Sequence, residues 1–249
     1  MKRTGRENQR FSVDFCINFH HNLGELHRIT NIGVKYLTNY AVITGDIIRS
    51  RQAKDRMELQ SDVETKLSFI NAEFAPDLAV NFQITLGDEF QGLVRSLAAV
   101  PTIASTLREQ LNPINVRLSI GIGPIATNMN KIISKMDGPA FHLSRDGISQ
   151  ISRDGERITI YRTSDAETNN ILNAVTLLTD ILLQKRTDKQ WQAIRLYRKE
   201  RNLKKVADRL NVKFQNIHKR LQAAHWDAWE QAELFVSNYL VSKFSPKKG

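Results

Sequence analysis

The chain has 249 residues, 41% of them hydrophobic, and a formal net charge of +10. This length allows one large domain or two small ones, and no apolar run is long enough for a helix that crosses a bilayer. Because a single cysteine cannot form an internal disulfide and the basic N-terminus is not followed by the apolar run of a signal peptide, we expect a cytoplasmic protein with no membrane partner.

The positive charge is concentrated toward the C-terminus. Residues 171–249 contain 16 Lys and Arg against 7 Asp and Glu, whereas residues 40–170 contain 14 against 16. A run of charge is usually a solvated face of a protein. Here it coincides with the helical pattern of a DNA-binding module, which favours a polyanionic partner.

The first part of the chain changes character at Tyr40. Residues 1–39 show no sustained hydrophobic period, and we expect them to form a poorly ordered extension. Tyr40–Ile47 has the apolar run of a buried strand. Apolar residues then recur at helical spacing over residues 54–75, and Pro76 ends that helix.

Alternating apolar residues predict an antiparallel hairpin next. Val80–Leu86 alternates with period two, and Gly87-Asp88 leads into a second apolar run at 90–94. Pro101 opens a further helix, and the remaining predicted elements are a strand at 116–122, a helix at 139–152 and a strand at 157–161. This order predicts an α+β protein in which residues 40–162 form a ferredoxin-like domain (split βαβ, palm-type), followed by a polar linker at 162–169.

Residues 170–244 are predicted to form an all-α helix-turn-helix domain. Helices at 173–183 and 188–199, the second capped by Thr187, precede two short helices joined at Asn211, a residue type that tolerates the left-handed conformation. The apolar positions of this helix pair are Val206, Leu210, Val212, Ile217 and Leu221. The segment resembles the region-4 helix-turn-helix of σ factors.

The second helix of the pair is the predicted DNA-binding element. It presents side chains that can contact base edges and phosphates of duplex DNA: Lys213, Gln215, Asn216, Lys219 and Arg220. A three-helix protein-interaction module is the alternative. The last predicted helix carries an aromatic face of Trp226, Trp229, Phe235 and Tyr239, which we expect to be intramolecular core, with a homodimer seam as the alternative.

Three carboxylates mark the candidate site of the first domain. Asp46 ends the first strand, and Asp88 and Glu89 lie at the hairpin tip, which a split βαβ sheet places beside that strand. Converging carboxylates repel one another unless a cation lies between them, and Mg²⁺ binds such sparse sets together with water and phosphate oxygens. Ordinary turn chemistry is the alternative, because Gly-Asp is common in turns. Arg49 and Arg51 can clamp phosphates, or have no function on a solvent-facing turn.

Four motifs in this order resemble the SatD family of bacterial proteins, over roughly residues 40–240. They are Thr44-Gly-Asp-Ile-Ile-Arg-Ser-Arg51, Leu86-Gly-Asp-Glu-Phe-Gln91, Arg117-Leu-Ser-Ile-Gly-Ile-Gly123 and Met136-Asp-Gly-Pro-Ala-Phe-His142.

The same acids are also similar to the palm domain of class III nucleotidyl cyclases and GGDEF diguanylate cyclases, which hold two Mg²⁺ ions on paired acids. That similarity implies that Asp46 and Asp88 bind Mg²⁺ or Mn²⁺, with Glu89 beside them, although Leu86 stands where GGDEF has its first glycine. Class III cyclases form their site across a dimer, so a homodimer is implied as well. The residues implied to contact a purine nucleotide are Arg49, Arg51, Gly87, Gly121 and Gly123.

The helix after the glycine-containing strand departs from the cyclase pattern. Class III cyclases place an Asn and an Arg there to stabilise the transition state, whereas this chain has His142 in the Asn place and Arg145 one residue out of step. Both are weak catalytic candidates. His142 fits a structural role on an amphipathic helix, and Arg145 can pair with Asp146 or with the acidic edge that the three carboxylates of the candidate site would form. We therefore expect the domain to bind a nucleotide and to turn it over very slowly or not at all.

These observations together predict a cytoplasmic DNA-binding regulator whose palm-like domain binds Mg²⁺ and a nucleotide as a signal. The first alternative is an active nucleotidyl cyclase, or a related phosphoryl-transfer enzyme, with a DNA-binding tail. The second is a protein-interaction module in which neither site binds its expected ligand.

Overall fold

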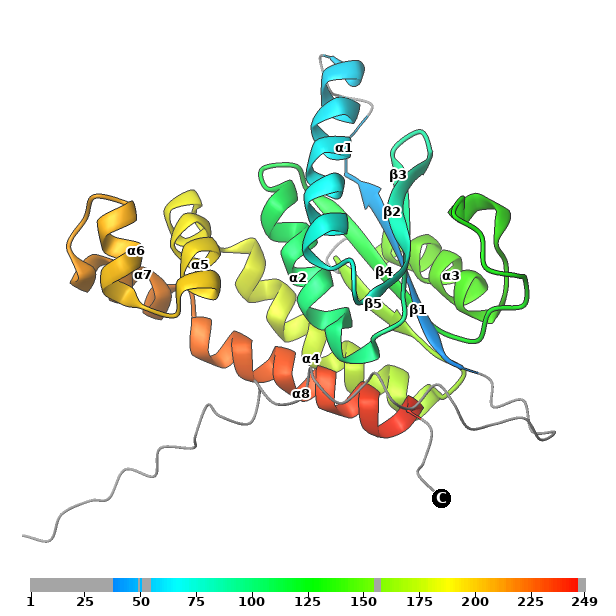
Figure 1. Ribbon diagram of the computed structural model, residues 1–249. Helices are drawn as coiled ribbons and strands as arrows, with labels where there is room; N and C mark the ends of the chain where they lie inside the picture. Colours follow the sequence, from blue (N-terminus) through cyan, green and yellow to red (C-terminus); the bar gives the residue numbers. More distant parts are fainter. Residues whose placement is uncertain (1–37, 49, 51–54, 155–157, 246–249) are drawn as a thin grey trace, which may run out of the picture. The chain divides into compact units, whose positions relative to one another are not determined.

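The computed structural model describes residues 38–48, 50, 55–154 and 158–245 (Figure 1). Apart from its last two residues, the expected N-terminal extension lies outside the described residues, and so do Arg49 and Arg51. Within the described ranges, no helix is long and apolar enough to cross a membrane.

The N-terminal part of the described chain forms a five-stranded sheet with the strand order β2-β3-β1-β4-β5. Neighbouring strands are antiparallel except for β4 and β5, which are parallel and joined by α3. The predicted β-α-β-β-α-β order is confirmed, with α3 and β5 as the added helix and strand. The elements are β1 (Tyr40–Ile47), α1 (Arg56–Glu73), β2 (Leu78–Leu86), β3 (Glu89–Val94), the 3₁₀ turn η3 (Leu97–Ala99), α2 (Val100–Leu111), β4 (Val116–Gly123), the 3₁₀ turn η4 (Ile133–Lys135), α3 (Pro139–Asp154) and β5 (Thr159–Arg162).

Strand β1 is buried on both faces and separates two layers of core. Ala41 and Ile43 pack with α1 and α2, whereas Val42 belongs to a smaller core with α3 and η4. Figure 1 shows α1 and α2 on one side of the sheet and α3 on the other. This division follows from the period-two alternation of side chains along a strand. On the α3 side, β1 changes from Val42 through Thr44 to Asp46, so this face becomes more polar toward the end of the strand.

Between β5 and residue 245, the last residue described, the chain forms five helices: α4 (Ala166–Gln184), α5 (Asp188–Glu200), α6 (Leu203–Arg209), α7 (Phe214–Ala223) and α8 (Trp226–Phe244). The predicted polar linker at 162–169 is wrong in its second half, because α4 already begins at Ala166. Asp165 caps this helix by accepting hydrogen bonds from the backbone N–H groups of Glu167 and Thr168. Residues 166–169, which the sequence suggested were part of a loop, are therefore the first turn of a capped helix.

The predicted start of α5 and the turn between α6 and α7 are confirmed. Thr187 caps α5, and Gln190 completes a capping box with it. Asn211 has a φ of 48°, in the left-handed region, and the chain reverses there from α6 to α7.

The C-terminal helices contribute to two cores. One core lies among α5, α6, α7 and the start of α8, and it includes Trp191, Ile194, Val206, Ile217 and Trp226. In contrast, Leu172 of α4 and Val236 and Leu240 of α8 belong to the core of the sheet. Helix α8 therefore packs against both.

This arrangement corrects the prediction for the aromatic face of α8. Trp226 and Trp229 are buried, as expected, but Phe235 is 46% exposed. Val236 is the residue that faces the sheet core, and the neighbouring Phe235 is consequently turned outward, with its ring stacked on Tyr239 at 5.9 Å between centroids.

Candidate functional site

The structure brings the three predicted acids together where β1 ends and the chain turns from β2 to β3, and we call this end of the sheet the acidic edge. Asp46 on β1 lies opposite Glu89 of β3 on one side and opposite Arg117 of β4 on the other. Gly87, with a φ of 61°, and Asp88 form the two-residue turn between β2 and β3. A positive φ at the first turn residue is readily adopted by glycine, and it sets Asp88 beside the end of β1, where its carbonyl accepts a hydrogen bond from Ile47 N at 3.2 Å.

Two of these acids have polar partners within the protein. Arg117 Nη1 lies 3.2 Å from Asp46 Oδ2, and the Ser50 hydroxyl donates a hydrogen bond to Asp88 Oδ2. Among the described residues, no group of three or more His, Cys, Asp and Glu side chains is close enough to hold a metal ion. Among the residues that the structure describes, the acids at this edge therefore do not form a complete protein cage for a metal.

The electrostatics of the edge reflect crowded negative charge. Burial raises the pKa of Asp46, the Asp88 carboxylate raises it further, and the hydrogen bond from Arg117 opposes both. Burial likewise raises the pKa of Glu89, followed by repulsion from Asp46 and Asp88, whereas Arg145 lowers it. A cation at this edge would relieve the repulsion.

His142 and Arg145 lie on one face of α3, and both side chains are exposed. The nearest acid to each is Asp137: His142 Nε2 is 3.5 Å and Arg145 Nη2 is 3.9 Å from Asp137 Oδ1. Arg145 also acts electrostatically on Glu89, so it belongs to the surroundings of the acidic edge. Two partners were expected for Arg145, Asp146 or the acidic edge. No ion pair with Asp146 is among the contacts of the described residues, whereas the effect on Glu89 agrees with the second alternative, and the ion pair itself is with Asp137.

Gly121 and Gly123 lie beneath α3. A Cβ atom on Gly121 would stand 2.2 Å from the Ala140 carbonyl oxygen and 2.4 Å from Ser144 N, both backbone atoms. On Gly123 the nearest atom would be Ala140 N at 3.3 Å. The absence of a side chain at Gly121 thus lets the helix approach the strand, and that backbone is covered by α3.

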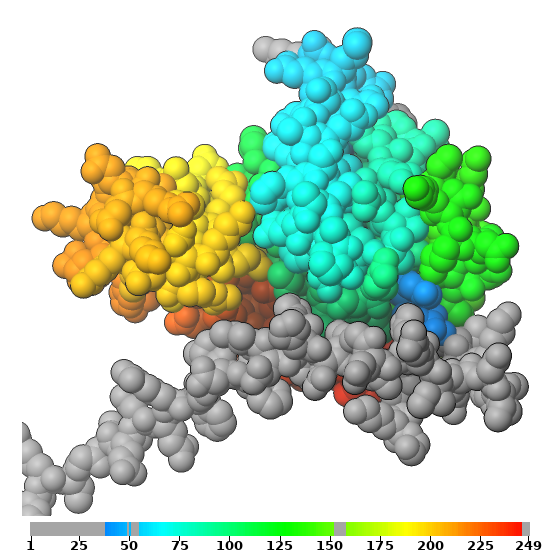
Figure 2. Space-filling model, viewed as in Figure 1, coloured from blue at the N-terminus to red at the C-terminus, as the bar shows by residue number. Residues whose placement is uncertain are grey.

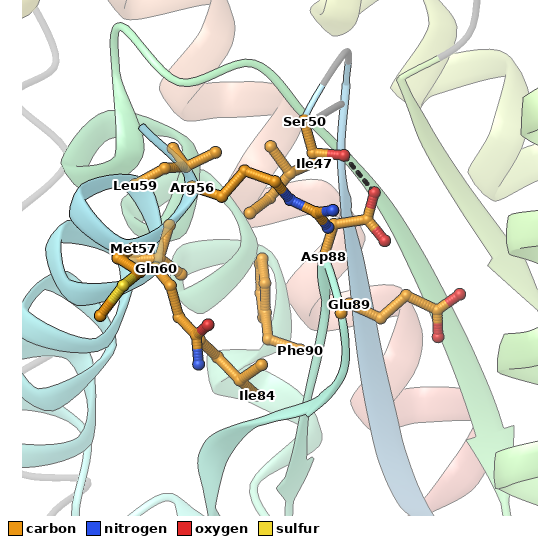
Figure 3. Close-up of a pocket in the computed structure, with 12 residues that line it drawn as sticks. Ile47, Ser50, Arg56, Met57, Leu59, Gln60, Ile84, Asp88, Glu89 and Phe90 are labelled. Atoms are coloured by element: carbon orange, nitrogen blue, oxygen red, sulfur yellow. Dashed lines mark hydrogen bonds between the residues drawn. The ribbon is translucent and has the colours of Figure 1, made fainter. Parts of the chain in front are cut away.

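A cavity of about 160 Å³ lies beside the acidic edge, between α1 and the hairpin (Figure 3). These two elements adjoin at the surface of the molecule (Figure 2). Ile47, Leu59 and Ile84 contribute apolar surface to it. In Figure 3, Arg56 extends from α1 toward Asp88, while the Glu89 carboxylate points away from the cavity.

Sequence reasoning missed three polar residues of this region: Ser50, Arg56 and Arg117. Only Arg117 lies in a segment that the sequence singles out, because it begins the motif at 117–123, and the structure pairs it with Asp46 across β1 and β4.

The second candidate site is the exposed face of α7. Ile217 and Leu221 are buried against α6, whose Val206 and Ala207 complete the contact. The opposite face is polar, and Lys213, Gln215, Asn216, His218 and Lys219 are exposed, with Arg220 partly so. In the described part of the chain no ion pair involves Lys213, Lys219 or Arg220. Figure 2 shows the orange atoms of α6 and α7 reaching the surface.

The comparisons with solved structures give weak similarities. The guanylyl cyclase domain of the RhoGC fusion protein from the aquatic fungus Blastocladiella emersonii is 16% identical, with 47% of this chain and 72% of that chain covered and a TM-score of 0.33. The Regulator of Polyketide Synthase Expression from Bifidobacterium adolescentis is 15% identical, with 82% and 79% covered and a TM-score of 0.27. No curated protein matches the chain.

A family model matches most of the sequence. The match covers residues 40–230, from the first residue of β1 into α8, and therefore includes the acidic edge and α7. The chain belongs to the SatD family.

Proposed function

We propose that this protein is a DNA-binding regulator in which α6 and α7 act as a helix-turn-helix, with α7 entering the major groove. The observation that carries the proposal is the face of α7, where exposed amide and cationic side chains are held from behind by the buried Ile217 and Leu221. Amides and cations of this kind hydrogen-bond base edges and phosphates.

The start of α7 supports the same reading. Its first turn contains no acidic residue, and the side chain of Lys213 at the N-cap position makes no capping hydrogen bond. The positive end of the helix dipole and the first backbone N–H groups are thus left without a negative side chain, which suits a DNA phosphate. Residues 171–249 also contain 16 Lys and Arg but only 7 Asp and Glu, and this positive charge favours binding to the phosphates of DNA.

Binding of the full-length protein to duplex DNA, measured by fluorescence anisotropy over a range of salt concentrations, tests this function. We expect affinity to fall steeply with salt, and the Lys219→Ala and Arg220→Ala variants each to reduce the slope of log K against log salt by about one. Gln215→Ala and Asn216→Ala should mainly relax preference among sequences. Lys131→Ala, an exposed cation of the sheet domain, is the matched control and should change neither quantity. Absence of duplex binding at low salt would remove the proposal.

We further propose that the acidic edge binds Mg²⁺ together with a purine nucleotide, which acts as a signal. What favours this is the mutual repulsion of Asp46, Asp88 and Glu89 beside a cavity into which Arg56 extends. The donors suit Mg²⁺, which commonly uses one or two carboxylates and fills its shell with water and phosphate oxygens. Asp46 and Asp88 would hold it, and the ion would neutralise phosphate charge. Because the described residues do not form a complete cage of protein ligands, we expect Mg²⁺ to bind well only with the nucleotide.

Calorimetric titration of ATP and GTP, with and without Mg²⁺ or Mn²⁺, tests this second site. Either Asp46→Asn or Asp88→Asn should abolish metal-dependent nucleotide binding, and the double variant should add little, because both residues serve one site. Glu73→Gln, an exposed acid at the far end of α1, is the control. If Asp46→Asn binds the nucleotide as the wild type does, the acids are ordinary turn residues and do not form a metal site.

Chromatography of the products in the same mixtures distinguishes a regulator that only binds the nucleotide from an active nucleotidyl cyclase. His142 and Arg145 are exposed and have Asp137 as their nearest acid, and the described contacts fix neither side chain in one orientation toward the acidic edge. We therefore expect no cyclic or dinucleotide product. Rapid formation of such a product, lost in Asp88→Asn, would favour the nucleotidyl cyclase.

A further inference from the structure

Phe214 stands apart from the other residues of α7. It is the first residue of the helix, its side chain is 44% exposed, and its neighbours along the chain are the exposed polar residues Lys213, Gln215 and Asn216. Within the described residues, no aromatic pair or cation–π contact involves its ring. A large apolar side chain is thus exposed to solvent beside polar residues at the N-terminal end of α7.

The geometry of α7 explains why the ring is exposed. Phe214, Ile217 and Leu221 lie on one stripe of the helix, three and four residues apart, yet Ile217 is 0% and Leu221 7% exposed. The stripe is covered by α6 and α5 only from Ile217 onward. Phe214 therefore extends past the end of the buried stripe, at the N-terminal end of α7.

We propose that Phe214 reads the C5 methyl group of thymine in the major groove. This inference rests on the proposed function, because it requires that α7 enters DNA. The N-terminal residues of a recognition helix are the ones that contact base edges. Among the groups that A·T and G·C base pairs expose in the major groove, the thymine methyl is the apolar one. Phenylalanine is among the side chains that contact it. Gln215 and Asn216, directly after Phe214, can pair with the adenine of the same or a neighbouring base pair.

The size of the effect follows from the area that one methyl group buries. Removing a methyl-sized apolar group from water contributes about 0.8 kcal/mol, which corresponds to a roughly fourfold change in affinity. We therefore expect each thymine that contacts Phe214 to be preferred about fourfold over deoxyuridine, which has the same hydrogen-bonding edge and lacks the methyl group.

The experiment uses the full-length protein and a duplex obtained by selection from random sequence. Each thymine of the selected site is replaced in turn by deoxyuridine, and affinity is measured for the wild type, Phe214→Ala, Phe214→Leu and Phe235→Ala. Phe235 is the matched control, because it is 46% exposed on α8, outside the helix-turn-helix. Thermal unfolding of each variant checks the fold.

We expect one or two positions at which deoxyuridine weakens wild-type binding about fourfold. Phe214→Ala should bind thymine and deoxyuridine equally there, Phe214→Leu should keep part of the preference, and Phe235→Ala should keep all of it. Equal binding of thymine and deoxyuridine by the wild type at every position overturns the inference but leaves DNA binding intact. The same holds if Phe214→Ala retains the preference. If selection yields no bound duplex at low salt, the proposed function itself fails.

Discussion

Gly121 is a residue at which the absence of a side chain determines how two elements pack. The backbone of β4 and the first turns of α3 approach so closely there that a Cβ atom would stand 2.2 Å from a carbonyl oxygen. Real Cβ contacts do not occur at that distance, and backbone atoms cannot move aside as a flexible side chain can. The glycine that resembles a nucleotide-binding residue in sequence thus has a packing role at this position.

Gly121→Ala should therefore destabilise the protein, by about 1–3 kcal/mol, because α3 must move away from the sheet. Gly123→Ala is the matched control: its Cβ would meet its nearest atom at 3.3 Å, so a small adjustment suffices and the loss should be smaller. Urea unfolding of both variants measures the difference. Equal stability of the two would show that α3 is not held at this distance from β4.

At the scale of elements, α2, α5 and α8 are joined by a buried set of charges. Arg198 of α5 lies 3.4 Å from Glu109 Oε2 of α2 and 3.5 Å from Glu233 Oε2 of α8, and its guanidinium lies over the Trp229 ring at 5.0 Å. Glu109 is 2% exposed. Burial raises the pKa of Glu109 to about 7, with Arg198, Arg195 and Arg186 opposing the rise and Glu233 adding to it.

This raised pKa predicts a dependence of stability on pH. Between the ordinary value of 4.5 and about 7, the folded protein holds the Glu109 proton and the unfolded chain does not. The contribution to stability is therefore complete below pH 4.5 and is lost as pH rises through about 7, by roughly 3 kcal/mol for a shift of this size. Glu109→Gln, which stays neutral, should flatten urea-unfolding stability between pH 5 and 8 relative to the wild type. Parallel pH profiles for the two proteins would contradict the assignment.

Local patterns were sufficient to predict most of the elements. Period-two alternation located β2 and β4, Thr187 marked the start of α5, and Asn211 marked the turn before α7. These features depend on residues close together in the chain, which is why a single sequence shows them. The placement of Asp46, Asp88 and Glu89 at one edge also followed, because the predicted strand order brings β1 beside the hairpin.

Long-range polar contacts could not be predicted in the same way. Arg108 and Asp180 have the charge of surface residues, yet both are buried and satisfied by distant elements. Arg108 Nη1 donates to the Val116 carbonyl at 2.9 Å, and Asp180 Oδ2 accepts from Thr159 N at 2.7 Å. These contacts hold α2 and α4 to β4 and β5. Nothing in the local pattern of either residue distinguishes it from an exposed one.

At the scale of the whole described chain, α8 connects the sheet to the helices that we propose bind DNA. Trp226 and Trp229 pack in the core of α5, α6 and α7, and Val236 and Leu240 pack in the core of the sheet. Arg198 adds a polar link between α5 and α2. A change in the sheet domain can thus reach α7 through packed elements, which a flexible linker would not allow.

This connection predicts that nucleotide and DNA binding are coupled. If Mg²⁺ and nucleotide at the acidic edge change DNA affinity by some factor, DNA must change nucleotide affinity by the same factor, typically 5- to 150-fold for coupled sites. Anisotropy with saturating nucleotide and calorimetry with saturating DNA measure the two factors independently. A factor of one in both measurements would show that the nucleotide is not a signal for DNA binding.

Arg198→Gln should reduce this coupling factor toward one while leaving each ligand's affinity alone nearly unchanged, because the residue contacts neither proposed site and only links α5 to α2 and α8. Arg201→Gln is the matched control. Arg201 also ends α5 and lies over Trp226, but its ion pair with Glu230 joins α5 to α8 without reaching α2. We expect it to keep the full coupling. Loss of coupling in both variants would assign the effect to the α5–α8 contact alone, and retention in both would assign it to the shared apolar packing of α8.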